Sequence, residues 1–272
     1  MALDIGAALR SGIDALTSED GLLVGAVFLL YSLGSLVVNE SLAAELLTLV
    51  FESDAYTAEQ RAAIESFGGG SPFALGVGLP VTVVLVVLVA LAGELVRYWA
   101  IRTFAGPAET ATDGLGDRAV MAVVLGGAIA LTTLLFQSVL PVVGQLGGLA
   151  TTLVGSIVGP VGWLVLVTVF VYLRQEIALN DGGYGATLRN SVARFLDEPV
   201  SIVVLLLLLG LFGLLGSLPV ILTGFVGGSG TALTVGTRLV SALLGTVFQV
   251  LGIAVVTDAY LQVRTSARES AA

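Results

Sequence analysis

The sequence contains no cysteine and no histidine among its 272 residues. Without cysteine the chain has no disulfide bond and no thiol nucleophile. Without histidine it lacks the commonest general base, and the two absences together remove the usual protein ligands of zinc and haem. We therefore expect no metal ion and no other cofactor. These absences are therefore more informative about function than any motif in the chain.

Lysine is absent as well, so all 11 basic residues are arginines, against 20 acidic residues and a net charge of −9. Excess acid is typical of the acidic proteome of haloarchaea, where molar salt shortens the range of charge repulsion to about 3 Å. A genome of high GC content would also replace lysine by arginine. Both interpretations lead to similar organisms, and we expect a haloarchaeal protein.

Charged side chains are missing from three long stretches of the chain, 119–173, 199–237 and 239–257. A helix of a water-soluble protein carries a polar stripe, and these stretches have none. Each is long enough to cross about 30 Å of hydrocarbon once or twice. The sequence therefore predicts an all-α protein, a polytopic transmembrane helical bundle of the cell membrane.

We expect one integral membrane domain, 1–272, with about six spans at 21–38, 74–96, 119–140, 152–174, 200–221 and 239–261. Residues 1–17 place apolar side chains at a loosely helical spacing, which favours a short helix in the membrane interface. The segment 39–73 is the most acidic connector, and we expect it to be extracellular and to contain interfacial helices.

The arginines indicate the orientation of the spans. Most of them follow an even-numbered span: Arg97, Arg102, Arg118, Arg174, Arg189, Arg194, Arg264 and Arg268. Only Arg61 and Arg238 lie on the other side. Arginine-rich connectors stay in the cytoplasm, so both termini are predicted to be cytoplasmic.

A weak internal repeat accompanies this pattern. The second, fourth and sixth spans each end with a tyrosine and an arginine: Tyr98 and Arg102, Tyr172 and Arg174, Tyr260 and Arg264. Three repeated helical hairpins would produce the pattern. The general preference of tyrosine for membrane interfaces would also produce it, and we favour that explanation.

Two charged residues sit near the predicted end of the second span, Glu94 and Arg97, one helical turn apart. An ionisable residue inside a span marks a functional site by default. We favour a structural role, because arginine reaches water easily near the interface. If the hairpin repeat holds, Glu94, Glu176 and Asp258 would gather at one cytoplasmic rim as a proton, cation or catalytic site.

Arg238 begins the sixth span on the predicted outer side. Simple anchoring at the interface is the favoured interpretation, and binding of a lipid phosphate or pairing with an outer acid are the alternatives.

Glycine and proline recur in two later spans: Gly155, Gly159, Pro160 and Gly162 in the fourth, and Gly210, Gly213, Gly216 and Pro219 in the fifth. Broken helices of this kind line substrate sites in transporters. Small residues more often let helices approach closely, and we favour close packing.

Residues 184–197, YGATLRNSVARFLD, have the composition of a short amphipathic helix before the fifth span. With this segment and the overall layout, the chain resembles a group of uncharacterised six-span haloarchaeal membrane proteins. That group is distantly similar to the membrane domain of some bacterial glycerophosphodiester phosphodiesterases. The resemblance implies a membrane domain alone, because the soluble catalytic domain of those enzymes has no counterpart here.

We therefore expect a non-enzymatic membrane protein that acts as an accessory, lipid-interacting or scaffold protein. Its expected partners are membrane lipids, and a second copy or another membrane protein. No segment is basic and aromatic enough for nucleic acid. The alternatives are a small transporter or channel that uses the broken fourth and fifth spans, and a membrane-embedded lipid enzyme.

Overall fold

The computed structural model describes residues 3–52, 72–110, 114–136, 160–226 and 231–271. Its elements are α1 (Ile5–Thr17), α2 (Glu19–Glu52), α4 (Leu79–Ala105), α5 (Leu115–Met121), the π-helix η1 (Ala122–Gly126), α6 (Gly127–Leu134), α9 (Leu173–Leu179), α10 (Tyr184–Asp197), α11 (Pro199–Val226) and α12 (Thr231–Ala271). Residues 160–169 are also helical. The predicted all-α class is confirmed.

Six helical segments are long and apolar enough to cross a membrane: Glu19–Leu49, Leu79–Ala105, Leu115–Leu134, Pro160–Leu179, Pro199–Thr223 and Thr231–Ser266. Large apolar side chains point outward along them, and Leu30, Val200 and Leu207 are each at least 69% exposed. A continuous apolar surface of this kind is not stable in water, whereas lipid covers it at no cost. The chain is a multi-span helical membrane protein.

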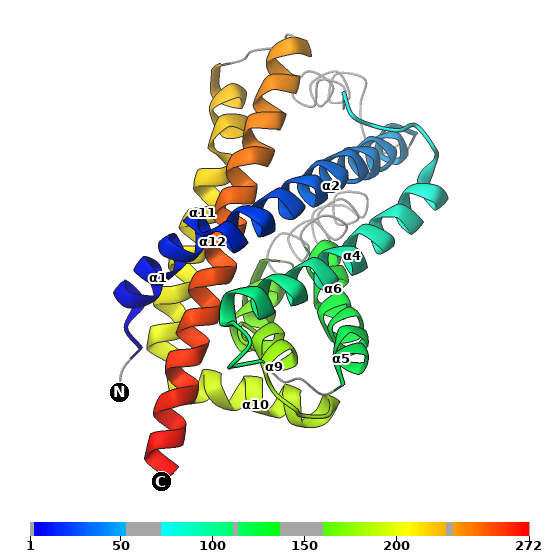
Figure 1. The fold of residues 1–272 in the computed structure, drawn as a ribbon. Helices are drawn as coiled ribbons and strands as arrows, with labels where there is room; N and C mark the ends of the chain where they lie inside the picture. Colours follow the sequence, from blue (N-terminus) through cyan, green and yellow to red (C-terminus); the bar gives the residue numbers. More distant parts are fainter. Residues whose placement is uncertain (1–2, 53–71, 111–113, 137–159, 227–230, 272) are drawn as a thin grey trace.

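Helix α10 lies crosswise at one end of the bundle, where α12 finishes (Figure 1). Both chain termini lie toward this end, as an even number of spans requires, and we call it the terminal end. The bounds of α10 agree with the amphipathic helix predicted for 184–197. At the opposite end, α2 finishes and α4 begins.

The first span is longer than predicted. Helix α2 continues without interruption to Glu52, so the first part of the predicted 39–73 connector belongs to the spanning helix. Residues 39–52 contain no glycine or proline, and leucine, alanine and glutamate are strong helix formers, so nothing ends the helix earlier. The rest of that connector, 53–71, lies outside the described residues.

The second span is displaced toward the terminal end. The segment 73–78 is not helical and is held against α2, because Glu40, Ser41 and Glu45 accept hydrogen bonds from the backbone N–H groups of this segment. Gly78 precedes α4 with φ +81°, a conformation that disfavours other residues. Helix α4 therefore begins at Leu79 and ends at Ala105, rather than running from 74 to 96.

The fourth and fifth spans differ in continuity. The fourth is interrupted by a turn at 170–172, away from the glycines and proline that predicted a break, and Gly155 and Gly159 lie outside the described residues. The fifth span is not broken, because α11 runs through its glycines and Pro219. At Gly216 an added Cβ would lie 2.9 Å from the Cα of Gly245, so this glycine allows α11 to approach α12, as the close-packing interpretation predicted.

The largest group of buried side chains lies toward the terminal end and joins α1, α4, α9, α11 and α12. Tyr172 and Tyr260 are fully buried in it, with ring centroids 5.6 Å apart, and Tyr98 packs against the same group. Tyr172 and Tyr260 therefore face other helices rather than lipid, and their position at the membrane interface stays a prediction. Their convergence is what a threefold hairpin repeat would produce, and the repeat stays a prediction.

Candidate functional site

Glu94 lies deep in the bundle. Its residue is 2% exposed, and it sits roughly three turns before α4 ends at Ala105, a rise of about 16 Å. The sequence placed it near the interface because the predicted span ended at 96. Since α4 extends further, the end of the helix no longer places Glu94 at the interface, and the structural role stays a prediction. A buried carboxylate at this depth needs strong partners.

Two arginines supply those partners. Arg97 Nη1 donates to Glu94 Oε1 at 2.9 Å from one turn along the same helix. Arg174 of α9 donates from Nε to Oε2 and from Nη2 to Oε1, both at 2.7 Å. The second contact is a bidentate guanidinium–carboxylate pair, the strongest geometry available to these groups. The carboxylate is therefore held from two helices at once.

A π-helical segment packs against this carboxylate. An added Cβ on Gly126, the last residue of η1, would lie 2.4 Å from Glu94 Oε2. Only glycine lets the backbone approach a side chain so closely. Short π-helical segments inside α-helices occur frequently at functional sites. The small residue and the local change of helix together make room for Glu94.

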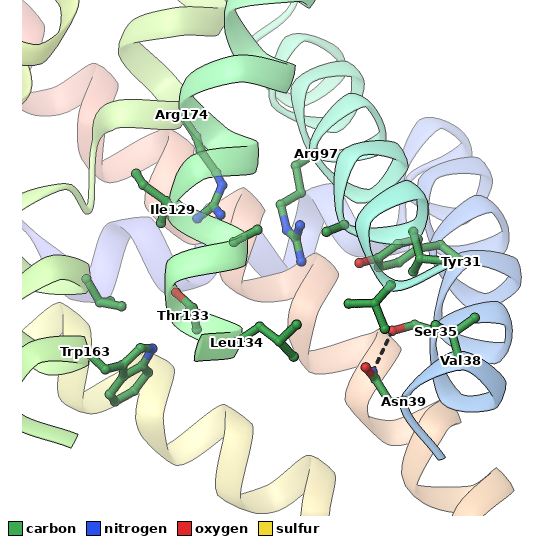
Figure 2. Close-up of a pocket in the computed structure, with 15 residues that line it drawn as sticks. Tyr31, Ser35, Val38, Asn39, Arg97, Ile129, Thr133, Leu134, Trp163 and Arg174 are labelled. Atoms are coloured by element: carbon green, nitrogen blue, oxygen red, sulfur yellow. Dashed lines mark hydrogen bonds between the residues drawn. The ribbon is translucent and has the colours of Figure 1, made fainter. Parts of the chain in front are cut away.

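A cavity of about 300 Å³ adjoins the two arginines (Figure 2). It lies between α2, α4, α6 and the helix that contains Trp163. Its lining combines polar and apolar side chains: Tyr31, Ser35, Val38, Asn39, Val86, Val89, Ala90, Arg97, Ile129, Ala130, Thr133, Leu134, Trp163, Val167 and Arg174. Arg97 and Arg174 point into it from α4 and α9.

The charge around this cavity is not balanced. Arg97 and Arg174 retain side-chain exposures of 19% and 32%, whereas the side chain of Glu94 is 1% exposed. No acidic side chain lines the cavity among the described residues. Two guanidinium groups thus share one carboxylate, which leaves a net charge of +1 at the cavity wall. An unneutralised charge inside a membrane is costly, so the arrangement favours an anion in the cavity.

A second, much smaller cavity touches Glu94 from the terminal side. It measures about 10 Å³ and is lined by Glu94, Tyr98, Ala122, Arg174 and Ile177. The buried hydroxyl of Tyr98 has no hydrogen-bond partner among the described residues. A volume of this size holds about one water molecule, which would satisfy the hydroxyl.

Glu176 belongs to a separate network on the other side of α9. It is fully buried, pairs with Arg194 of α10, and accepts a hydrogen bond from Asn180, whose side chain also contacts Tyr260. Burial would lower the pKa of Arg194, but its bond to Glu176 and its neighbour Tyr260 outweigh burial and raise that pKa. This network joins α9, α10 and α12.

The remaining predicted residues lie elsewhere. Asp258 accepts a hydrogen bond from Gln262, one turn along α12. Arg238 pairs with the buried Glu40 of α2 at 3.2 Å, which is the outer-acid alternative rather than anchoring alone. The structure thus brings Glu94 and Arg97 together, but it places Glu176, Asp258 and Arg238 in three other sets of contacts. A shared site of Glu94, Glu176 and Asp258 does not form.

Sequence reasoning missed three parts of this site. It used Arg174 only as a marker of topology and of the weak repeat, although Arg174 is the first charge after the long neutral stretch 119–173. It did not single out Gly126 or Trp163, because glycine and aromatic residues are frequent in membrane helices. No local pattern marks the pairing of Arg174 with Glu94.

No family model, curated protein or solved structure matches the chain. The resemblance to uncharacterised six-span haloarchaeal proteins therefore stays a prediction, and function must be argued from the site.

Proposed function

We propose that the chain is a non-enzymatic, lipid-interacting membrane protein that binds the anionic headgroup of an amphiphile in the cavity beside Arg97 and Arg174. One observation carries the proposal: two guanidinium groups border the cavity and share a single carboxylate. The headgroup would supply the missing negative charge. Donors of this kind recognise phosphate and carboxylate oxygens.

The remaining lining supports an amphiphile rather than a simple ion. Ser35, Asn39 and Thr133 offer hydrogen bonds, and Val86, Leu134 and other apolar side chains cover much of the wall. Mixed linings of this volume are typical of binding sites for small organic molecules. The cavity lies among helices that are long and apolar enough to span a membrane, where lipids are the most abundant amphiphiles.

Binding without catalysis is favoured by the state of the carboxylates. Glu94 and Glu176 are each held by arginine, and Asp258 is bonded to Gln262. Acid–base catalysis needs a carboxylate that is free to take and release a proton near the reacting atoms. Among the described residues these acids support packing and charge balance instead.

Trp163 provides a direct test, because it lines the cavity and the chain has only one other tryptophan, Trp99. The Trp99→Phe protein in neutral detergent is titrated with methyl dodecyl phosphate, and Trp163 fluorescence is followed. We expect saturable binding that weakens about tenfold or more in Arg97→Gln and in Arg174→Gln, since each loses charge-assisted hydrogen bonds. Arg189→Gln removes an exposed arginine on α10 and serves as the control.

Dimethyl phosphate carries the same single charge but lacks the dodecyl chain. It therefore distinguishes a lipid headgroup from a water-soluble anion as the ligand. Equal binding of dimethyl phosphate would assign the cavity to a water-soluble anion. Loss of Trp163 response to both compounds would contradict anion binding altogether.

A transporter is the second candidate, and the two cavities on either side of Glu94 favour it. A solute that moved through the bundle would have to pass the pair formed by Glu94 and Arg174. Liposomes that contain the protein and show uptake of the bound anion, abolished in Arg174→Gln, would establish transport. Binding without uptake would assign the cavity to a resident lipid.

A further inference from the structure

Glu94 holds the two arginines in place, and its negative charge also affects which ligands the cavity can bind. We propose, resting on the function proposed above, that Glu94 restricts the cavity to ligands with a single negative charge. A phosphodiester headgroup fits this requirement, and the dianion of a phosphate monoester does not. Glu94 is therefore a specificity-determining residue.

The charge count supports this specificity. Arg97 and Arg174 carry two positive charges, and Glu94 neutralises one of them. A monoanion brings the group to neutrality. A dianion leaves one negative charge inside the membrane with no partner, and such a charge is strongly disfavoured.

The geometry keeps Glu94 in this role. Its two oxygens accept from both arginines, and its Oε2 lies against the backbone of Gly126. A bidentate contact and close packing both hold the carboxylate in place, so a ligand is expected to add to the group instead of replacing Glu94. Within the described residues, Nε and Nη2 of Arg97 and Nη1 of Arg174 make no hydrogen bond, although the Arg97 guanidinium also lies over the ring of Tyr31. Those nitrogen atoms are the donors left for one anionic group.

Two probes with the same alkyl chain test the proposal. Methyl dodecyl phosphate carries one negative charge, and dodecyl phosphate carries nearly two at pH 8.5, because its second pKa is about 6. The Trp99→Phe protein is titrated with each, and Trp163 fluorescence reports binding. We expect the diester to bind at least about tenfold more tightly at pH 8.5, since the unpaired charge of the monoester is not compensated.

The pH dependence of probe binding tests the proposal without any substitution in the site. Between pH 8.5 and pH 5 dodecyl phosphate becomes a monoanion, and its affinity should rise to match that of the diester. Among the residues that the structure describes, the titratable groups that face the cavity or Glu94 are Tyr31, Tyr98, Arg97 and Arg174, and both probes experience them equally. The difference between the probes therefore reports the charge of the ligand.

Substitution of Glu94 reverses the preference. Glu94→Gln keeps the size of the side chain beside Gly126 and raises the local charge to +2, so dodecyl phosphate should bind more tightly than the diester at pH 8.5. Glu176→Gln removes another arginine-paired, buried carboxylate outside the cavity and should leave the preference unchanged. If either variant does not fold, the pH series on the parent protein still decides the matter.

The outcomes separate the two proposals. Failure of both probes to bind at any pH overturns the proposed function and this inference with it. Binding of both probes with equal affinity at pH 8.5 overturns this inference alone.

Discussion

Arg174 and Glu94 are 80 residues apart in the chain and form a bidentate pair, with both N–O distances at 2.7 Å. Helix α9, which carries Arg174, also carries Glu176 two positions later, and neighbours two apart on a helix do not share a face. One short helix therefore joins α4 on one side and α10 and α12 on the other. A turn at 170–172 precedes α9 and separates it from the helix at 160–169.

Arg174→Lys tests the bidentate contact. Lysine keeps the positive charge but cannot form two parallel hydrogen bonds to one carboxylate. We expect a loss of about 1–3 kcal/mol in the free energy of unfolding, measured by denaturant or thermal unfolding in micelles. Arg97→Lys, which replaces a single hydrogen bond, should cost less. Equal losses in the two variants would show that charge alone matters.

Gly126→Ala tests the close approach of η1 to Glu94. The new Cβ would lie 2.4 Å from Oε2, so the carboxylate or the helix must move. We expect a destabilisation of about 1–3 kcal/mol and weaker binding in the Trp163 assay. Gly210→Ala in α11 is the matched control, because nothing lies within 4 Å of its added Cβ. That change should be neutral or slightly stabilising, and a similar loss in both variants would count against the packing argument.

Arg194→Gln tests the network on the other side of α9. It leaves the fully buried Glu176 without its cationic partner, which should cost about 3–5 kcal/mol of stability. Arg189→Gln removes an exposed arginine of the same helix, and the change should stay within about 0.5 kcal/mol. Thermal unfolding of the two variants side by side gives the comparison. An Arg194→Gln protein as stable as the parent would show that Glu176 finds another partner.

Substitutions of Glu40 and Arg238 test which side chain stabilises the end of the bundle opposite the termini. Glu40 is buried and also accepts a hydrogen bond from the backbone of Phe73, whereas the side chain of Arg238 is 41% exposed. Arg238→Ala leaves the buried Glu40 without its cationic partner and should cost about 1–3 kcal/mol, and Glu40→Ala should cost more, because it also releases the segment 73–78 from α2. Proteolysis near 73–78 should also become faster in Glu40→Ala. The reverse order of stability would assign the main role to the arginine.

Single engineered cysteines test the predicted orientation of the chain in the membrane, because the natural sequence contains no cysteine that would also react. Thr265 near the end of α12 and Leu75 before α4 are both exposed, and α12 finishes at the terminal end whereas α4 begins at the opposite end (Figure 1). If the arginine distribution gives the orientation correctly, a membrane-impermeant maleimide labels Leu75→Cys in intact cells. Thr265→Cys should react only after lysis. The opposite labelling pattern would invert the predicted topology and leave the fold unaffected.

The ends of the spans were predicted less well than their number. The helix-forming run 39–52 extended α2, and the bonds from Glu40, Ser41 and Glu45 to the segment 73–78 displaced the start of α4. These bonds join residues at least 33 positions apart, so no local pattern contains them. The displacement matters for the site, because Glu94 is then followed by about three further turns of α4 instead of standing at the end of its span.

The sequence by itself determined that this chain crosses a membrane about six times as helices, because transfer of apolar side chains into lipid is a local property that adds up along each stretch. Tertiary structure alone decided that Glu94 meets Arg174, that Glu176 meets Arg194, and that a cavity with surplus positive charge lies beside the first pair. Those contacts depend on how helices distant in the chain rotate and pack against one another. Inside a membrane that packing is selected by close fit and by the need to pair every buried charge, and neither is visible in a single stretch of sequence.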